Sequence, residues 1–147
     1  MREVIKEKLV DALASAPPRL TRREARLPAF PGKAYVGHAL ETAVLIELER
    51  RKCEVGYVFT PGGYEVDFLA RTWDNQFTLI QVAADLSDQA TREREFRALA
   101  DALTAHRRAK GLVLTLRSTD ALHARADAPK GVLVRPAWEW MLERGDA

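Results

Sequence analysis

The clearest pattern in the chain is an alternation of apolar and acidic residues, followed by a turn and an apolar run. The stretch 64–71 reads YEVDFLAR, in which Glu65 and Asp67 alternate with apolar residues. The apolar positions are Val66, Phe68 and Ala70. Period-two alternation predicts a strand with both carboxylates on one face and the apolar side chains on the other. After an Asp-Asn turn, the run FTLIQV is typical of a central strand covered on both faces, with Gln81 as its polar residue.

The other patterns predict further helices and strands in a definite order. Apolar residues recurring every three or four positions predict helices, and short β-branched runs between turn residues predict strands. The expected helices cover 2–14, 38–51, 90–108 and 136–144, the expected strands cover 53–59, 64–71, 76–83, 112–116 and 132–135, and 118–129 is a loop or short helix. The crossover helix 90–108 predicts that the strands on either side of it are parallel.

Length and composition limit the class of protein. A chain of 147 residues suits one domain, and its 47% hydrophobic and 30% charged residues argue against extended disorder. The single cysteine, Cys53, excludes an internal disulfide framework and a cysteine-rich zinc site. The first ten residues are charged throughout, unlike a signal peptide, and no apolar run reaches the ~20 residues that span a bilayer. We therefore expect a soluble, cytoplasmic protein with no membrane partner.

The net charge of +2 does not by itself indicate a nucleic-acid partner, but the basic residues are clustered. Four arginines at helical spacing lie in the N-terminal part, which prolines break up into an arm. They are Arg19, Arg22, Arg23 and Arg26. If 19–26 is helical, its four arginines share one face. This face could contact phosphates, or it could simply be exposed to solvent, and the sequence does not distinguish the two. The clusters 50–52 and 107–110 end predicted helices, where the helix dipole favours cations.

Four polar residues from three predicted elements complete the pattern: Glu41, Glu65, Asp67 and Gln81. The arrangement of these residues, together with the order of predicted helices and strands, resembles the restriction-endonuclease-like, or PD-(D/E)XK, fold. This α/β fold has an αβββαβ core with a mixed central sheet flanked by helices. Five stretches resemble one branch of it, the C-terminal domain of bacterial and archaeal AAA-type ATPases: LETAVLIELERR, GYEVDFLAR, LIQVAADLSDQATREREFRAL, GLVLTL and VRPAWEWMLE. The resemblance implies an N-terminal helix and basic arm over 1–36 and a nuclease-like domain over 37–147.

The arm also resembles a part of those ATPases. The segment LTRREARLPAFPGKAYV is similar to the lead into the first strand of their motor domain, yet no G-x-x-x-x-G-K-[ST] occurs in the chain. Gly37-His38 begins the nuclease-like helix instead. The resemblance therefore implies a member of this group without its motor domain, and we do not expect ATP hydrolysis.

The resemblance also implies a role for each site residue. Phosphodiester hydrolysis in this fold uses Mg²⁺ held by oxygen ligands. Asp67 matches the metal-binding acid, Glu41 the helix acid that holds a metal-bound water, and Glu65 is a nearby carboxylate. Gln81 stands in place of the second acid without its charge, and Ala83 in place of the lysine that stabilises the transition state. This predicts a degenerate, DNA-associated nuclease-like domain that is weakly active or inactive, with Mg²⁺ as its possible cofactor.

Several interpretations stay open on the sequence alone. Arg92 and Arg94 could contact nucleic acid. Alternatively, Arg92, Arg94 or Arg97 could pair with Glu65 and Asp67 in a buried ionic network that fixes helix to sheet. Glu41 could serve the positive end of its helix dipole. Two other functions remain: an active Mg²⁺-dependent endonuclease, structure-specific like Holliday-junction resolvases, and a protein-interaction module. Homodimers are frequent in this fold, so a dimer is compatible with the resemblance.

Overall fold

A five-stranded mixed sheet organises residues 33–143, the part of the chain that the computed structural model describes. The strands are β1 (Glu54–Phe59), β2 (Glu65–Arg71), β3 (Phe77–Ala83), β4 (Ala109–Thr115) and β5 (Val132–Pro136), and the helices are α2 (Lys33–Arg50), α3 (Gln89–Ala105), α4 (Ser118–Ala124) and α5 (Ala137–Leu142). The strands lie in chain order, antiparallel from β1 to β3 and parallel from β3 to β5. The order α2-β1-β2-β3-α3-β4 is the expected αβββαβ core, so the predicted fold class is confirmed.

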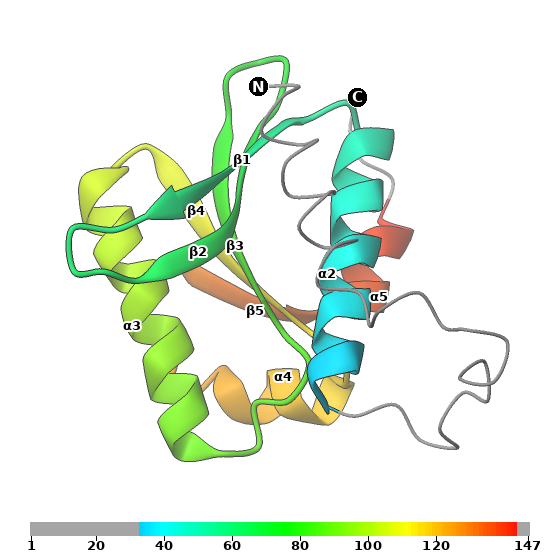
Figure 1. Cartoon of the computed structure of the whole chain (residues 1–147), viewed down its shortest axis with the longest axis vertical. Helices are drawn as coiled ribbons and strands as arrows, with labels where there is room; N and C mark the ends of the chain where they lie inside the picture. The colour runs from blue at the N-terminus through cyan, green and yellow to red at the C-terminus, as the bar shows by residue number, and fades with distance from the viewer. Residues whose placement is uncertain (1–32, 144–147) are drawn as a thin grey trace, which may run out of the picture.

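Helices cover both faces of this sheet. Figure 1 shows α2 and α5 on one side and α3 with α4 on the other, and the buried side chains divide into two clusters accordingly. We call them the α2-side core and the α3-side core. Because β3 and β4 lie between both, the last five residues of each strand are buried. Burial on both faces explains why their sequences are apolar runs without a period of two.

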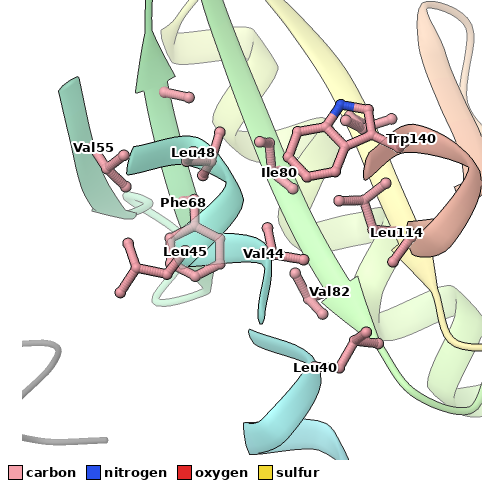
Figure 2. Close-up of a cluster of buried hydrophobic side chains, with 13 residues drawn as sticks. Leu40, Val44, Leu45, Leu48, Val55, Phe68, Ile80, Val82, Leu114 and Trp140 are labelled. Atoms are coloured by element: carbon pink, nitrogen blue, oxygen red, sulfur yellow. The ribbon is translucent and has the colours of Figure 1, made fainter. Parts of the chain in front are cut away.

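The α2-side core forms because α2 presents an apolar residue on every turn. Figure 2 shows Leu40, Val44 and Leu48 pointing toward Ile80 and Val82 of β3. Trp140 of α5 belongs to the same core. Burial of such aliphatic side chains contributes about 1.5–3 kcal/mol each, so this contact dominates the attachment of α2 to the sheet.

Two helix boundaries differ from the prediction by three residues or more. α2 begins at Lys33, earlier than the expected residue 38, so Glu41 lies two turns after its start and no acid occupies the first turn. The helix-dipole interpretation of Glu41 is therefore wrong. α3 ends at Ala105 and not at 108, because Ala109 already pairs with Phe77 in the parallel ladder.

A bulge in β2 overturns the predicted alternation. Val66 pairs with Val58 of β1, but Leu69 pairs with Gly56, so β2 has one residue more than β1 between these pairs. An extra residue moves the following side chains to the other face of a sheet. Val66 accordingly packs in the α3-side core, whereas Phe68 packs in the α2-side core. The prediction that the apolar residues of β2 share one face is wrong, and Asp67 lies at the bulge.

Some predictions fall outside residues 33–143. These are the helix over 2–14, the four arginines at 19–26 and most of the predicted arm over 1–36. Within the described helices, none is long and apolar enough to cross a bilayer.

Candidate functional site

Asp67 bridges the two strands that flank the candidate site. The last registered pair of the β2–β3 ladder before the bulge is Phe68 with Ile80. Beyond it, Oδ2 of Asp67 accepts a hydrogen bond from the backbone N–H of Val82 at 2.8 Å. A buried backbone N–H needs an acceptor, and here a side-chain carboxylate supplies it where the strands diverge. Asp67 therefore has a structural role at this fork of the sheet.

Gln81 links the sheet to α3. The residue is 6% exposed, and its Nε2 donates to Oε2 of Glu95 at 2.6 Å. Glu95 also accepts from the guanidinium of Arg94. The Oε1 atom of Gln81 is the buried side-chain oxygen for which the described residues supply no hydrogen-bond partner. Gln81 thus contributes one orphaned neutral oxygen and one donor that is already used.

The structure does not bring Glu41 and Gln81 together. α2, which carries Glu41, packs on the face of β3 formed by Ile80 and Val82. Gln81 lies between these two residues in the strand and points to α3 on the opposite face. Glu65 is exposed at the start of β2, opposite Phe59 of β1.

The residues at these positions do not fit a magnesium ion. Mg²⁺ in proteins is held by carboxylates, usually with several waters in an octahedral arrangement. Among residues 33–143, no three His, Cys, Asp or Glu side chains are grouped so that they could hold a metal. Gln81 is neutral and hydrogen-bonded to Glu95, and Ala83 is a buried methyl in the α3-side core. We therefore derive no metal-dependent step for this site.

The two arginines predicted to approach the site are used in other contacts. The Nη1 atom of Arg92 donates to the carbonyl oxygens of Leu86 and Ser87, each at 2.8 Å, and its Nε donates to Asp127 at 3.0 Å. Arg92 therefore closes the loop before α3. Arg94 pairs with its neighbour Glu95 at 2.8 Å and is largely exposed.

Sequence reasoning missed Glu95, the partner of Gln81. The alternating charges from Arg92 to Arg97 are typical of a solvated helix face. Nothing in this pattern distinguishes Glu95, which contacts Gln81 of the sheet, from its exposed neighbours. The available signal is spacing: Glu95 lies one position before Phe96, which is buried in the α3-side core. A glutamate beside a core residue at the sheet-facing edge of a helix is a candidate partner for a polar residue in the sheet.

Comparisons with known proteins do not show a family for this chain. No protein-family model matches the chain, and no curated protein matches it. Among solved structures, the chain is similar to the crystal structure of a repair endonuclease from Pyrococcus abyssi, with a TM-score of 0.45 and 10% sequence identity over 75% of this chain. The match spans 49% of that protein, about half of its length. The fold of this chain is established by its own αβββαβ order of helices and strands.

Proposed function

We propose that this chain is a PD-(D/E)XK nuclease-like domain, of the kind that accompanies AAA-type ATPases, which no longer cleaves DNA and serves as a DNA-associated module. The observation that carries the proposal is the hydrogen bond between Gln81 and Glu95 at 2.6 Å. The residue that takes the place of the second catalytic acid is neutral, buried and used to fasten α3 to the sheet.

The neighbouring positions support loss of catalysis. Hydrolysis of a phosphodiester needs a group that generates the nucleophile and a charge that stabilises the transition state. Asp67 holds the N–H of Val82, and Ala83 provides neither charge nor proton. A domain with these residues keeps the shape of the nuclease fold and lacks the groups that its chemistry requires.

The distribution of basic residues supports association with DNA. Near the starts of β4 and β5, four exposed cations form no ion pair with a described acid: Arg107, Arg108, Lys110 and Lys130. The register of Gly111 with Val132 brings the two lysines to the same end of the sheet. Unpaired cations attract phosphates and release counterions when they bind them, so binding should weaken as salt increases.

Calorimetric titration with Mg²⁺ and Mn²⁺ tests the loss of catalysis, with the wild type beside Asp67→Asn. Plasmid, single-stranded and branched DNA are incubated with the same samples. We expect no saturable metal binding and no cleavage by either protein, together with salt-sensitive DNA binding in fluorescence anisotropy. Saturable metal binding and cleavage that Asp67→Asn abolishes would instead identify an active Mg²⁺-dependent endonuclease. Absence of binding to every DNA would turn the proposal toward a protein-interaction module.

A further inference from the structure

A cleft of about 650 Å³ opens at the end of the sheet opposite Asp67 and Gln81. It lies between the C-terminal end of α2, the turn that joins β2 to β3, and Trp140 of α5. Its floor is apolar and consists of Leu48, Ala70, Ile80, Leu112 and Trp140. Pockets of ~300–1,000 Å³ bind small organic groups, so this cleft has room for a nucleobase with its sugar.

Arg51 of the α2 end and Trp140 of α5 form one wall of the cleft. The guanidinium of Arg51 stacks over the Trp140 ring at 4.4 Å and donates to the Trp140 carbonyl oxygen at 2.6 Å. Its Nε also bonds Glu47 at 2.7 Å. These contacts fix the end of α2 against α5 along this wall of the cleft.

Trp73 stands on the opposite edge of the cleft and is 80% exposed. The turn that carries it is closed by backbone hydrogen bonds from Thr72 to Gln76 and from Asn75 to Thr72. Asn75 adopts φ 60°, a left-handed conformation that asparagine tolerates better than most residues. A tryptophan held this far into water by a closed turn is a ready surface for stacking a planar ring.

Two lysines without an ion pair among residues 33–143 border the same cleft. Lys52 lines it, just after α2. Lys110 is the ladder partner of Thr78, which also lines the cleft, and paired residues share a face of the sheet. Glu47 accepts hydrogen bonds from Arg50 and Arg51, which also line the cleft. Asp74 accepts a hydrogen bond from the Thr72 hydroxyl and keeps its negative charge. The cations Arg50, Arg51 and Lys52 outnumber the acids Asp74 and Glu47, so the edge of the cleft carries net positive charge next to an exposed aromatic ring.

An exposed aromatic ring beside cations matches the chemistry of a base joined to a phosphate. We propose that this cleft binds single-stranded nucleic acid, with a base stacked on Trp73 and backbone phosphates against Lys52 and Lys110. The proposal rests on the proposed DNA-associated function and names the form of nucleic acid and the surface that holds it. A duplex is disfavoured because its bases stack on each other and reach Trp73 only after unpairing.

Fluorescence anisotropy of a labelled oligothymidylate with the full chain tests the proposal. We expect Trp73→Ala to weaken binding about tenfold, the loss typical of one stacked base. The double variant with Lys52→Gln and Lys110→Gln should bind more weakly and show a smaller dependence on salt. Matched controls are Trp138→Ala, an exposed tryptophan outside the cleft, and Arg97→Gln on α3, across the sheet. Both controls should bind as the wild type does.

Cys53 provides a second, local readout, since it is the only cysteine of the chain and lines the cleft. Burial raises the pKa of its thiol, so alkylation by iodoacetamide should be slow and easily followed. Saturating oligothymidylate should slow it several-fold further in the wild type, and not in Trp73→Ala at the same oligonucleotide concentration.

The outcomes separate the two proposals. DNA binding that is unchanged in the cleft variants and leaves Cys53 alkylation unaffected would overturn this site while the DNA-associated function stands. Tighter binding to duplex than to oligothymidylate would do the same. Failure to bind any DNA overturns both. Polyglutamate could also displace the labelled oligothymidylate as effectively as unlabelled oligothymidylate does, with equal effect on the wild type and on Trp73→Ala. That result would show a cationic surface without selectivity for bases and would overturn the stacking site.

Discussion

At the scale of single residues, the polar groups at the fork of the sheet stabilise the fold, and Asp67 is the most direct case. Asp67→Ala removes the acceptor of the Val82 N–H and should lower the free energy of unfolding by about 1–3 kcal/mol. Asp67→Asn keeps an oxygen acceptor and should lose less. Urea unfolding at neutral pH measures both. Equal stability of Asp67→Ala and the wild type would contradict the structural role of this carboxylate.

The ionisation of Glu47 should make the free energy of unfolding depend on pH. Glu47 as a whole residue is 8% exposed, and the hydrogen bond from Arg50 is the main reason that the carboxyl pKa lies below its usual value of 4.5, with Arg51 adding to it. A lowered folded-state pKa gives stability that is present above about pH 4.5 and lost as the pH falls through the folded value. Urea unfolding should therefore show a gap between wild type and Glu47→Gln at neutral pH that closes in acid.

The neighbouring Glu49 serves as the control for that experiment. Glu49 is exposed on the same helix and forms no ion pair with a described residue. Glu49→Gln should unfold close to the wild type across the whole pH range. A gap between wild type and Glu47→Gln that is constant down to pH 3 would show that the lost stability comes from packing and not from the ionised carboxylate.

The candidate site was only partly predictable from its residues. Asp67 and Gln81 stand out in the sequence because polar side chains in mostly apolar strands require hydrogen-bond partners when they are buried. Their partners do not stand out, because the Val82 N–H is backbone and Glu95 lies on another element among exposed charges. Periodicity reports which face a residue prefers, whereas a hydrogen-bond partner depends on how two elements meet.

At the scale of elements, the order from α2 to α5 was predictable because each carries its own local signal. Helical spacing, turn residues and apolar runs all act within a few positions of the chain. The bulge in β2 was not predictable in this way, since it is set by pairing with Gly56 and Val58 of β1. One inserted residue there decides whether Val66 and Phe68 share a core, which is why the prediction of one common face for the apolar residues of β2 was wrong.

The close approach of α3 to β4 at Gly111 predicts that a larger side chain there would destabilise the fold. A Cβ added at Gly111 would lie 2.9 Å from Val132 Cγ2 and 3.0 Å from Leu103 Cδ1, closer than carbon atoms normally pack. Gly111→Ala should therefore cost about 1–3 kcal/mol through overpacking. Gly56→Ala is the matched control, because nothing lies within 4 Å of its added Cβ. Thermal unfolding compares them, and equal melting temperatures would contradict a close approach of α3 to β4.

At the scale of the whole molecule, the sheet is stable only with both faces covered. The α2-side core contains Ile80 and Val82 of β3, and α2 supplies Leu40, Val44 and Leu48 against them. Without α2 these strand residues would face water, losing about 0.8 kcal/mol for each CH₂ group that is no longer buried. The boundary of the folding unit therefore lies before α2 and not after it.

Two truncated chains test that boundary. A fragment of 33–147 keeps α2 and both cores, so it should unfold in one cooperative transition near the melting temperature of the full chain. A fragment of 53–147 lacks α2 and should show no cooperative transition in calorimetry. The longer fragment also keeps the cleft beside Trp73 while it lacks the four arginines at 19–26, so its oligothymidylate binding should retain the Trp73 dependence. Loss of cooperativity in 33–147 would extend the folding unit into the first 32 residues and make the predicted arm part of the domain.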